Sequence, residues 1–130
     1  MDYQRTIELD QPYDDAVALT RSALAEQGFG ILTEIDMKAT LKAKRDAEIE
    51  PYVILGACNP ALAQRALEIE PGVGVLLPCN VVVRARGEHR STIHVFEPLL
   101  MPEVTAIPGL QPLAEEAAGL LDAAFASLGG

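Results

Sequence analysis

Residues 52–60 read Tyr-Val-Ile-Leu-Gly-Ala-Cys-Asn-Pro, and no other stretch constrains the architecture as closely. The unbroken apolar run from Tyr52 to Cys58 predicts a strand buried on both of its faces. Asn59 is a preferred helix cap, and Pro60 suits the first position of a helix. The strand therefore passes directly into a helix. The core face of this helix is expected to consist of Leu62, Ala66, Leu67 and Ile69.

The chain before this stretch predicts two strands and two helices. Alternating apolar residues predict a strand over residues 3–9, although Arg5 interrupts its apolar face. A helix should begin near Pro12 and end at Gly28, which tolerates the left-handed conformation found after helix ends. Residues 29–35 predict a second strand, and Asp36 can cap a short helix whose lysines face water.

The chain after it predicts a strand pair and a long helix. Residues 75–83 are rich in Val and Leu and predict a strand, within which Pro78 marks a bulge or an edge. Residues 91–96 should return as its antiparallel partner. Apolar residues recur at helical spacing from Leu113 to Leu128. The segment between these elements, residues 98–109, is irregular or a short helix.

The resulting order, β-α-β-α-β-α-β-β-α, predicts a single α+β domain over residues 1–130. It contains a largely antiparallel sheet with packed helices. The hydrophobic fraction of 49% is enough to build a core. The net charge of −9 disfavours nucleic acid and anionic membranes as partners, because both are recognised by cationic side chains. With no evident signal peptide and no membrane-length apolar run, we expect a cytoplasmic protein with two reduced cysteines.

Three stretches resemble a known family. They are Gly28-Phe29-Gly30-Ile31-Leu32-Thr33-Glu34-Ile35-Asp36-Met37-Lys38-Ala39-Thr40-Leu41-Lys42, then Pro51 to Pro60, then Leu76-Leu77-Pro78-Cys79-Asn80-Val81-Val82-Val83. Together they resemble the domain of unknown function 302 (DUF302) family over most of the chain. The resemblance implies an antiparallel sheet gripped by helices, similar to the TATA-box-binding-protein-like folds, and a homodimer. It implies no reaction, and therefore no catalytic residue.

Cys58 and Cys79 are the chain's two cysteines, and they lie on strands joined by one helix. Such a connection often returns the chain to a neighbouring strand, so the two thiols could be close. One interpretation is simple packing as small hydrophobic residues. Another is a soft-metal or haem-type site completed by Met101, His94 or a second subunit. A third is a reactive thiol at Cys58, where the following helix start would lower the pKa of the thiol.

Asn59 and Asn80 follow the two cysteines directly. Asn59 is explained as a helix cap, whereas an amide inside the Val-rich strand around Asn80 must find partners. We therefore expect a small binding module whose pocket lies near Cys58, Asn59, Cys79 and Asn80 and takes a small molecule or a soft metal. The alternatives are a thiol redox enzyme using Cys58 and a purely structural dimer. No nucleotide-binding or hydrolase motif is present in the sequence.

Overall fold

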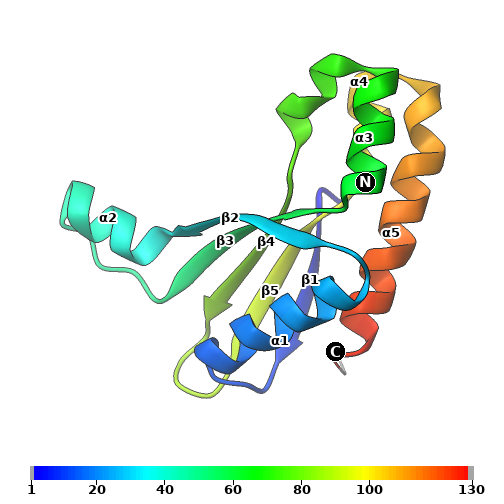
Figure 1. The fold of residues 1–130 in the computed structure, drawn as a ribbon. Helices are drawn as coiled ribbons and strands as arrows, with labels where there is room; N and C mark the ends of the chain where they lie inside the picture. The colour runs from blue at the N-terminus through cyan, green and yellow to red at the C-terminus, as the bar shows by residue number, and fades with distance from the viewer. Residues whose placement is uncertain (1, 129–130) are drawn as a thin grey trace.

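The computed structural model describes residues 2–128, which form one antiparallel sheet with helices on both sides (Figure 1). The five strands lie in the order β1-β5-β4-β3-β2. Their bounds are Gln4–Leu9 for β1, Gly30–Asp36 for β2, Tyr52–Cys58 for β3, Cys79–Ala85 for β4 and Ser91–Phe96 for β5. Each strand is antiparallel to its neighbours, which confirms the α+β class and the antiparallel sheet predicted from the sequence.

Five α-helices and two short 3₁₀ helices connect and cover the strands of the described part of the chain. The segment 98–109 contains a short helix, so this part of the expectation is confirmed. The helices span Tyr13–Glu26 for α1, Met37–Arg45 for α2, Pro60–Ile69 for α3, Leu100–Thr105 for α4 and Gln111–Ala126 for α5, with η1 at Pro71–Leu76 and η2 at Pro108–Leu110.

The start of β4 differs from the expectation. The sequence pattern predicted a strand from residue 75 onward, but residues 71–76 form η1 and β4 begins only at Cys79. Pro78 therefore precedes the strand and does not form a bulge within it. The physical reason is that proline has no N–H to donate to a sheet ladder, so pairing starts at the next residue.

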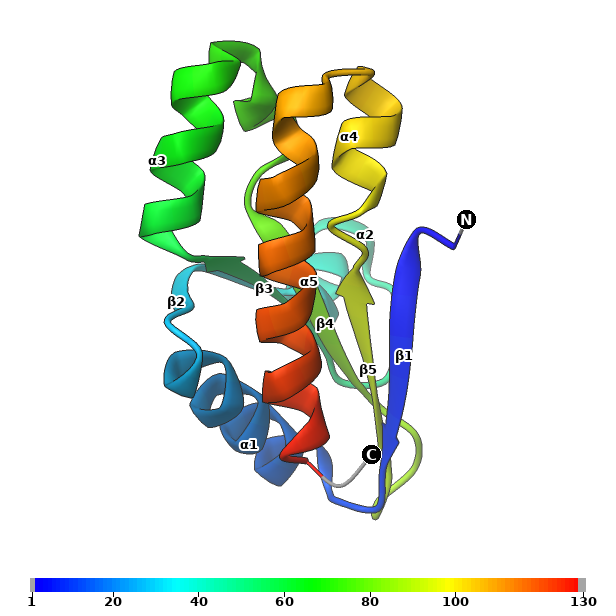
Figure 2. The same cartoon turned by 90° about the vertical axis from the view of Figure 1, so that its right-hand side faces the viewer.

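The helices are divided unequally between the two faces of the sheet. Figure 2 shows α1 and α5 in front of the sheet and α2 behind it, while α3 and α4 extend beyond one end of the strands. Figure 1 agrees, because α2 projects to the opposite side of the sheet from α5. Helix α2 has no buried residue. The face of the sheet opposite α1 and α5, which we call the open face, is therefore only partly covered.

The strand β3 shows the consequence of this one-sided packing. Its buried residues include Val53, Leu55 and Ala57, which face α1 and α5, whereas Tyr52 and Ile54 on the other side are only half-buried. The prediction of a strand buried on both faces was therefore wrong. A continuous apolar run indicates burial only where helices cover both faces, and here one layer of helices does most of the covering.

Local capping follows the sequence closely. Asp36 accepts a hydrogen bond from the Ala39 amide at 2.9 Å, and Asn59 accepts one from the Leu62 amide at 3.3 Å. Gly28 has a φ of +84° just after α1, as expected of a helix-ending glycine. Within residues 2–128, no helix is both long and apolar enough to cross a membrane.

Candidate functional site: an apolar cavity beyond the end of the sheet

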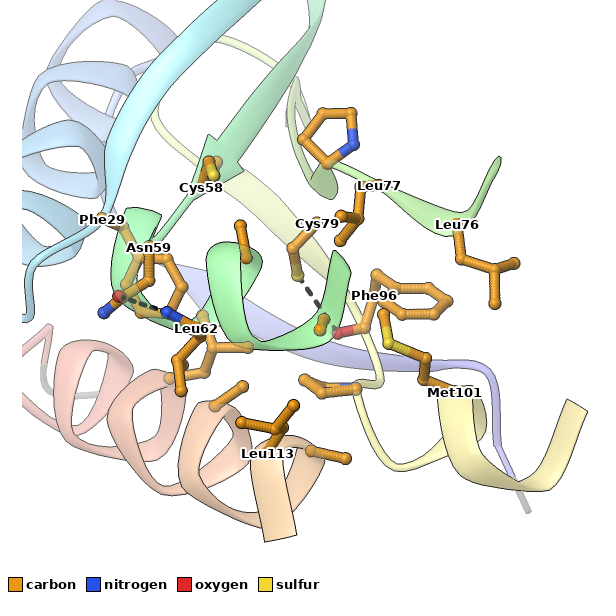
Figure 3. Close-up of a pocket in the computed structure, with 18 residues that line it drawn as sticks. Phe29, Cys58, Asn59, Leu62, Leu76, Leu77, Cys79, Phe96, Met101 and Leu113 are labelled. Carbon is orange, nitrogen blue, oxygen red and sulfur yellow. Dashed lines mark hydrogen bonds between the residues drawn. The ribbon is translucent and has the colours of Figure 1, made fainter. Parts of the chain in front are cut away.

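A cavity of about 70 Å³ lies where β3 ends and β4 begins. Figure 3 shows side chains from the sheet, α3, α4 and the start of α5 converging on it. Its walls are almost entirely hydrocarbon. Representative side chains are Phe29, Leu62, Leu77, Phe96, Met101 and Leu113.

Sheet register and helix capping place the polar and sulfur groups at this cavity. Ala57 of β3 pairs with Cys79 of β4, so the end of one strand lies beside the start of the other. Cys58 and Asn59 follow Ala57 directly, and the cap formed by Asn59 starts α3 at this point. The cavity is therefore a product of the strand-to-helix junction that residues 52–60 encode.

Cys79 points toward the cavity in Figure 3, and its thiol donates a weak hydrogen bond to the Phe96 carbonyl oxygen at 3.9 Å. Burial raises the pKa of the Cys79 thiol to about 12. The nearby Arg5 guanidinium lowers this pKa and the Glu97 carboxylate raises it, but burial dominates. The thiol is therefore protonated at neutral pH and behaves as a small apolar group.

Cys58 lies at the cavity edge and is half-buried. Burial raises the pKa of its thiol, which is opposite to the lowering that the following helix start was expected to produce. Successive residues of a strand point to opposite faces, so Cys58 points away from the face shared by Ala57 and Cys79. Both cysteines are free, and their sulfur atoms are clearly separated in Figure 3.

An ion cluster borders the cavity near Cys79. The Arg5 guanidinium contacts Glu97 through two hydrogen bonds of 3.1 and 3.2 Å and also pairs with Asp122 of α5. Arg5 interrupts the apolar pattern of β1 because it lies on the α5 side of the sheet and joins β1, the end of β5 and α5. Its charge is already balanced by the two carboxylates, so the cluster leaves no free cation at the cavity.

Asn80 and His94 lie apart from the cavity. They line a separate hollow on the open face, because Asn80 follows Cys79 in β4 and must point to the opposite side of the sheet. The structure therefore brings Cys58, Asn59 and Cys79 together but places Asn80 elsewhere. The strict alternation of a strand was a signal in the sequence that could have separated Cys79 from Asn80.

The proposed metal-ligand set is divided in the same way. Cys79 and Met101 reach the cavity, Cys58 lies at its edge, and His94 is on the other side of the sheet. Among residues 2–128, no three His, Cys, Asp or Glu side chains form a group that could hold a metal ion. The raised pKa of both thiols further disfavours the thiolate form that soft metals bind.

Sequence reasoning missed the aromatic and aliphatic walls of the cavity, notably Phe29, Phe96 and Leu121. Apolar side chains that line a cavity and apolar side chains that fill a core give the same sequence pattern. Only their arrangement in space distinguishes the two. Here three helices meet the end of the sheet, and their side chains do not completely fill the space between them.

Comparison with known proteins agrees with this architecture. No curated protein matches the chain. The crystal structure of an uncharacterized conserved protein DUF302 from Bacillus stearothermophilus is similar, with a TM-score of 0.86 and 26% sequence identity. The match covers 95% of this chain and 96% of that chain. The family model described as Domain of unknown function DUF302 matches residues 5–128. The chain therefore belongs to the DUF302 family.

Proposed function

We propose that this protein is a binding module that takes a small apolar ligand, or the apolar end of a larger one, into the cavity beside Cys79. The observation that carries the proposal is the cavity itself, whose walls are almost entirely hydrocarbon, come from seven elements of the fold and contain no charged side chain. Apolar cavities of this kind stay dry, and the entry of an apolar group into them is favourable.

The size of the cavity limits the ligand. An apolar cavity of roughly 150 Å³ is known to accept benzene or xenon. The cavity of about 70 Å³ is half as large, so a short alkyl group or a single xenon atom suits it in the present conformation. A longer ligand would place only its end inside and leave the remainder outside.

The chemistry of the two thiols supports binding over catalysis. Burial raises the pKa of both, so neither is poised as a thiolate nucleophile at neutral pH. A thiol redox enzyme would need Cys58 as a thiolate at neutral pH, and the raised pKa of this thiol disfavours that form. Protonated sulfur and the Met101 thioether are polarisable, and they make favourable contacts with apolar ligands.

The test uses straight-chain primary alcohols of increasing length and xenon as probes. Binding is followed by the shift of the urea unfolding midpoint and by amide chemical shifts of α3 and β4. We expect xenon and the alkyl probes to stabilise the folded state and to cause saturable chemical-shift changes, which are largest at residues that line the cavity. A ligand that binds only the folded state stabilises it. At concentrations above Kd, this stabilisation grows with the logarithm of the ligand concentration.

Two matched substitutions in α3 provide the control. Ala63→Leu would fill the cavity, whereas Ala61→Leu adds the same side chain at an exposed position outside it. We expect Ala63→Leu to weaken probe binding at least ten-fold and Ala61→Leu to leave it unchanged. Equal binding by the two variants, or shifts that lie away from the cavity, would exclude this site.

A further inference from the structure

A second hollow, of about 350 Å³, lies on the open face of the sheet. Its floor and walls come from Tyr3, Tyr52, Asn80, Val82, His94 and Phe96. This volume lies within the range of roughly 300–1,000 Å³ that is typical of small-molecule sites. The hollow contains Asn80 and His94, which the apolar cavity does not use.

Strand alternation brings an amide, an aliphatic side chain and a guanidinium to this face of β4. Asn80, Val82 and Arg84 are every second residue of the strand and therefore point to the same side. Val82 pairs with His94, and Arg84 pairs with Tyr52 on the other neighbouring strand. Asn80 and Val82 line the hollow, whereas Arg84 lies at its margin, where it contacts the lining residue His94.

A hydrogen-bond chain holds His94 in one state. The Arg84 Nε–H donates to His94 Nε2 at 2.9 Å, so this ring nitrogen carries no proton. The proton of the neutral ring is then on Nδ1, which donates to the Gln4 side-chain oxygen at 2.6 Å. His94 therefore positions the Arg84 side chain and adds no charge of its own.

The charge of Arg84 is not balanced by a carboxylate. The side chain is half-buried, yet it forms no ion pair with any acidic group of residues 2–128. Four other arginines do form such pairs, namely Arg5, Arg21, Arg65 and Arg90. Because its Nε–H is used by His94, the two Nη groups remain to bind an anion. Arg45 and Arg86 also form no ion pair within residues 2–128, but both are exposed, so Arg84 is the one half-buried guanidinium of the described chain without a carboxylate partner.

We propose that this hollow is a second ligand site, which takes a small aromatic carboxylate. The ring lies over Val82 between the aromatic side chains of Tyr52 and Phe96. The carboxylate accepts hydrogen bonds from the Nη groups of Arg84, which match its planar geometry. Asn80, exposed at the rim, supplies an amide to a polar substituent on the ring.

The first experiment is a titration of the ¹⁵N-labelled protein with 4-hydroxybenzoate, followed by amide chemical shifts. The comparison ligand is 4-hydroxybenzyl alcohol, which has the same ring and no negative charge. We expect saturable shifts in residues 80–84 and 92–96, with the alcohol binding at least about ten-fold more weakly, since hydrogen bonds to charged groups are the stronger class. Equal affinity for the two compounds, or no saturation at millimolar concentration, would overturn the proposal.

Substitutions of equal charge separate a specific site from general attraction. Arg84→Gln and Arg86→Gln each remove one positive charge, but Arg84 contacts His94, which lines the hollow, whereas Arg86 is exposed and contacts Thr92, which does not. We expect Arg84→Gln to reduce carboxylate affinity about ten-fold or more and Arg86→Gln to change it less than two-fold. Equal losses in both variants would show that only net charge matters and would refute the site.

Asn80→Ala covers the case in which Arg84→Gln fails to fold. This exposed side chain can be removed at little structural cost, and we expect weaker binding of 4-hydroxybenzoate but not of benzoate, which lacks the hydroxyl group. The solution mass of the protein completes the test. A dimer in which a second copy protects the amides of residues 80–84 would occupy the hollow and contradict the proposal.

Discussion

The substitution Leu121→Ala tests the link between core packing and the apolar cavity. Leu121 is fully buried in α5, packs in the main core and also lines the cavity. Truncation to alanine removes the equivalent of three methylene groups, or about 2.4 kcal/mol at about 0.8 kcal/mol each. The neighbouring cavity hinders collapse of the new space, so the total loss should approach about 3–5 kcal/mol.

The loss is measured by urea unfolding followed by circular dichroism, and the slope of the free energy against urea should not change. Leu67→Ala is the matched control, because Leu67 on α3 is 42% exposed and the same truncation should cost well under about 1.5 kcal/mol. The enlarged cavity should also accept longer alcohols than the parent protein does. A cost for Leu121→Ala no larger than that of Leu67→Ala, or unchanged selectivity for alcohol length, would refute the reasoning.

Three further predictions concern single groups. Burial is the main cause that lowers the pKa of His94 below 6.5, and the charge of Arg84 lowers it further. The unfolded chain therefore binds the proton more readily than the folded protein does. The free energy of unfolding should therefore fall as the pH drops below about 6.5, and His94→Gln should show a shallower fall in urea titrations at several pH values. A disulfide reagent at pH 8 should label Cys58 before Cys79 in the folded protein, because the pKa of Cys79 is about 12; the reverse order would contradict the burial. Asn59→Ala should cost about 1 kcal/mol of stability by unfolding, whereas Asn59→Asp should retain the cap.

The local structure was largely predictable, because capping and periodicity are properties of neighbouring residues. Asp36 and Asn59 cap the helices that follow them, and Gly28 ends α1 as its position indicated. The site was only partly predictable. Cys58, Asn59 and Cys79 do meet at a cavity, whereas Asn80 lies on the opposite face. The expected homodimer stays a prediction, which the solution mass would test.

The sequence by itself determined the elements, their order and the junction from β3 into α3, since these depend on alternation, caps and the positions of Gly and Pro. Only the tertiary structure decided which face of the sheet α1 and α5 cover and that α2 lies on the other side. It also decided that a space stays open beside Cys79 and that Arg84 has no carboxylate partner within residues 2–128. Packing and charge pairing join residues that are distant in the chain, so no local pattern records them.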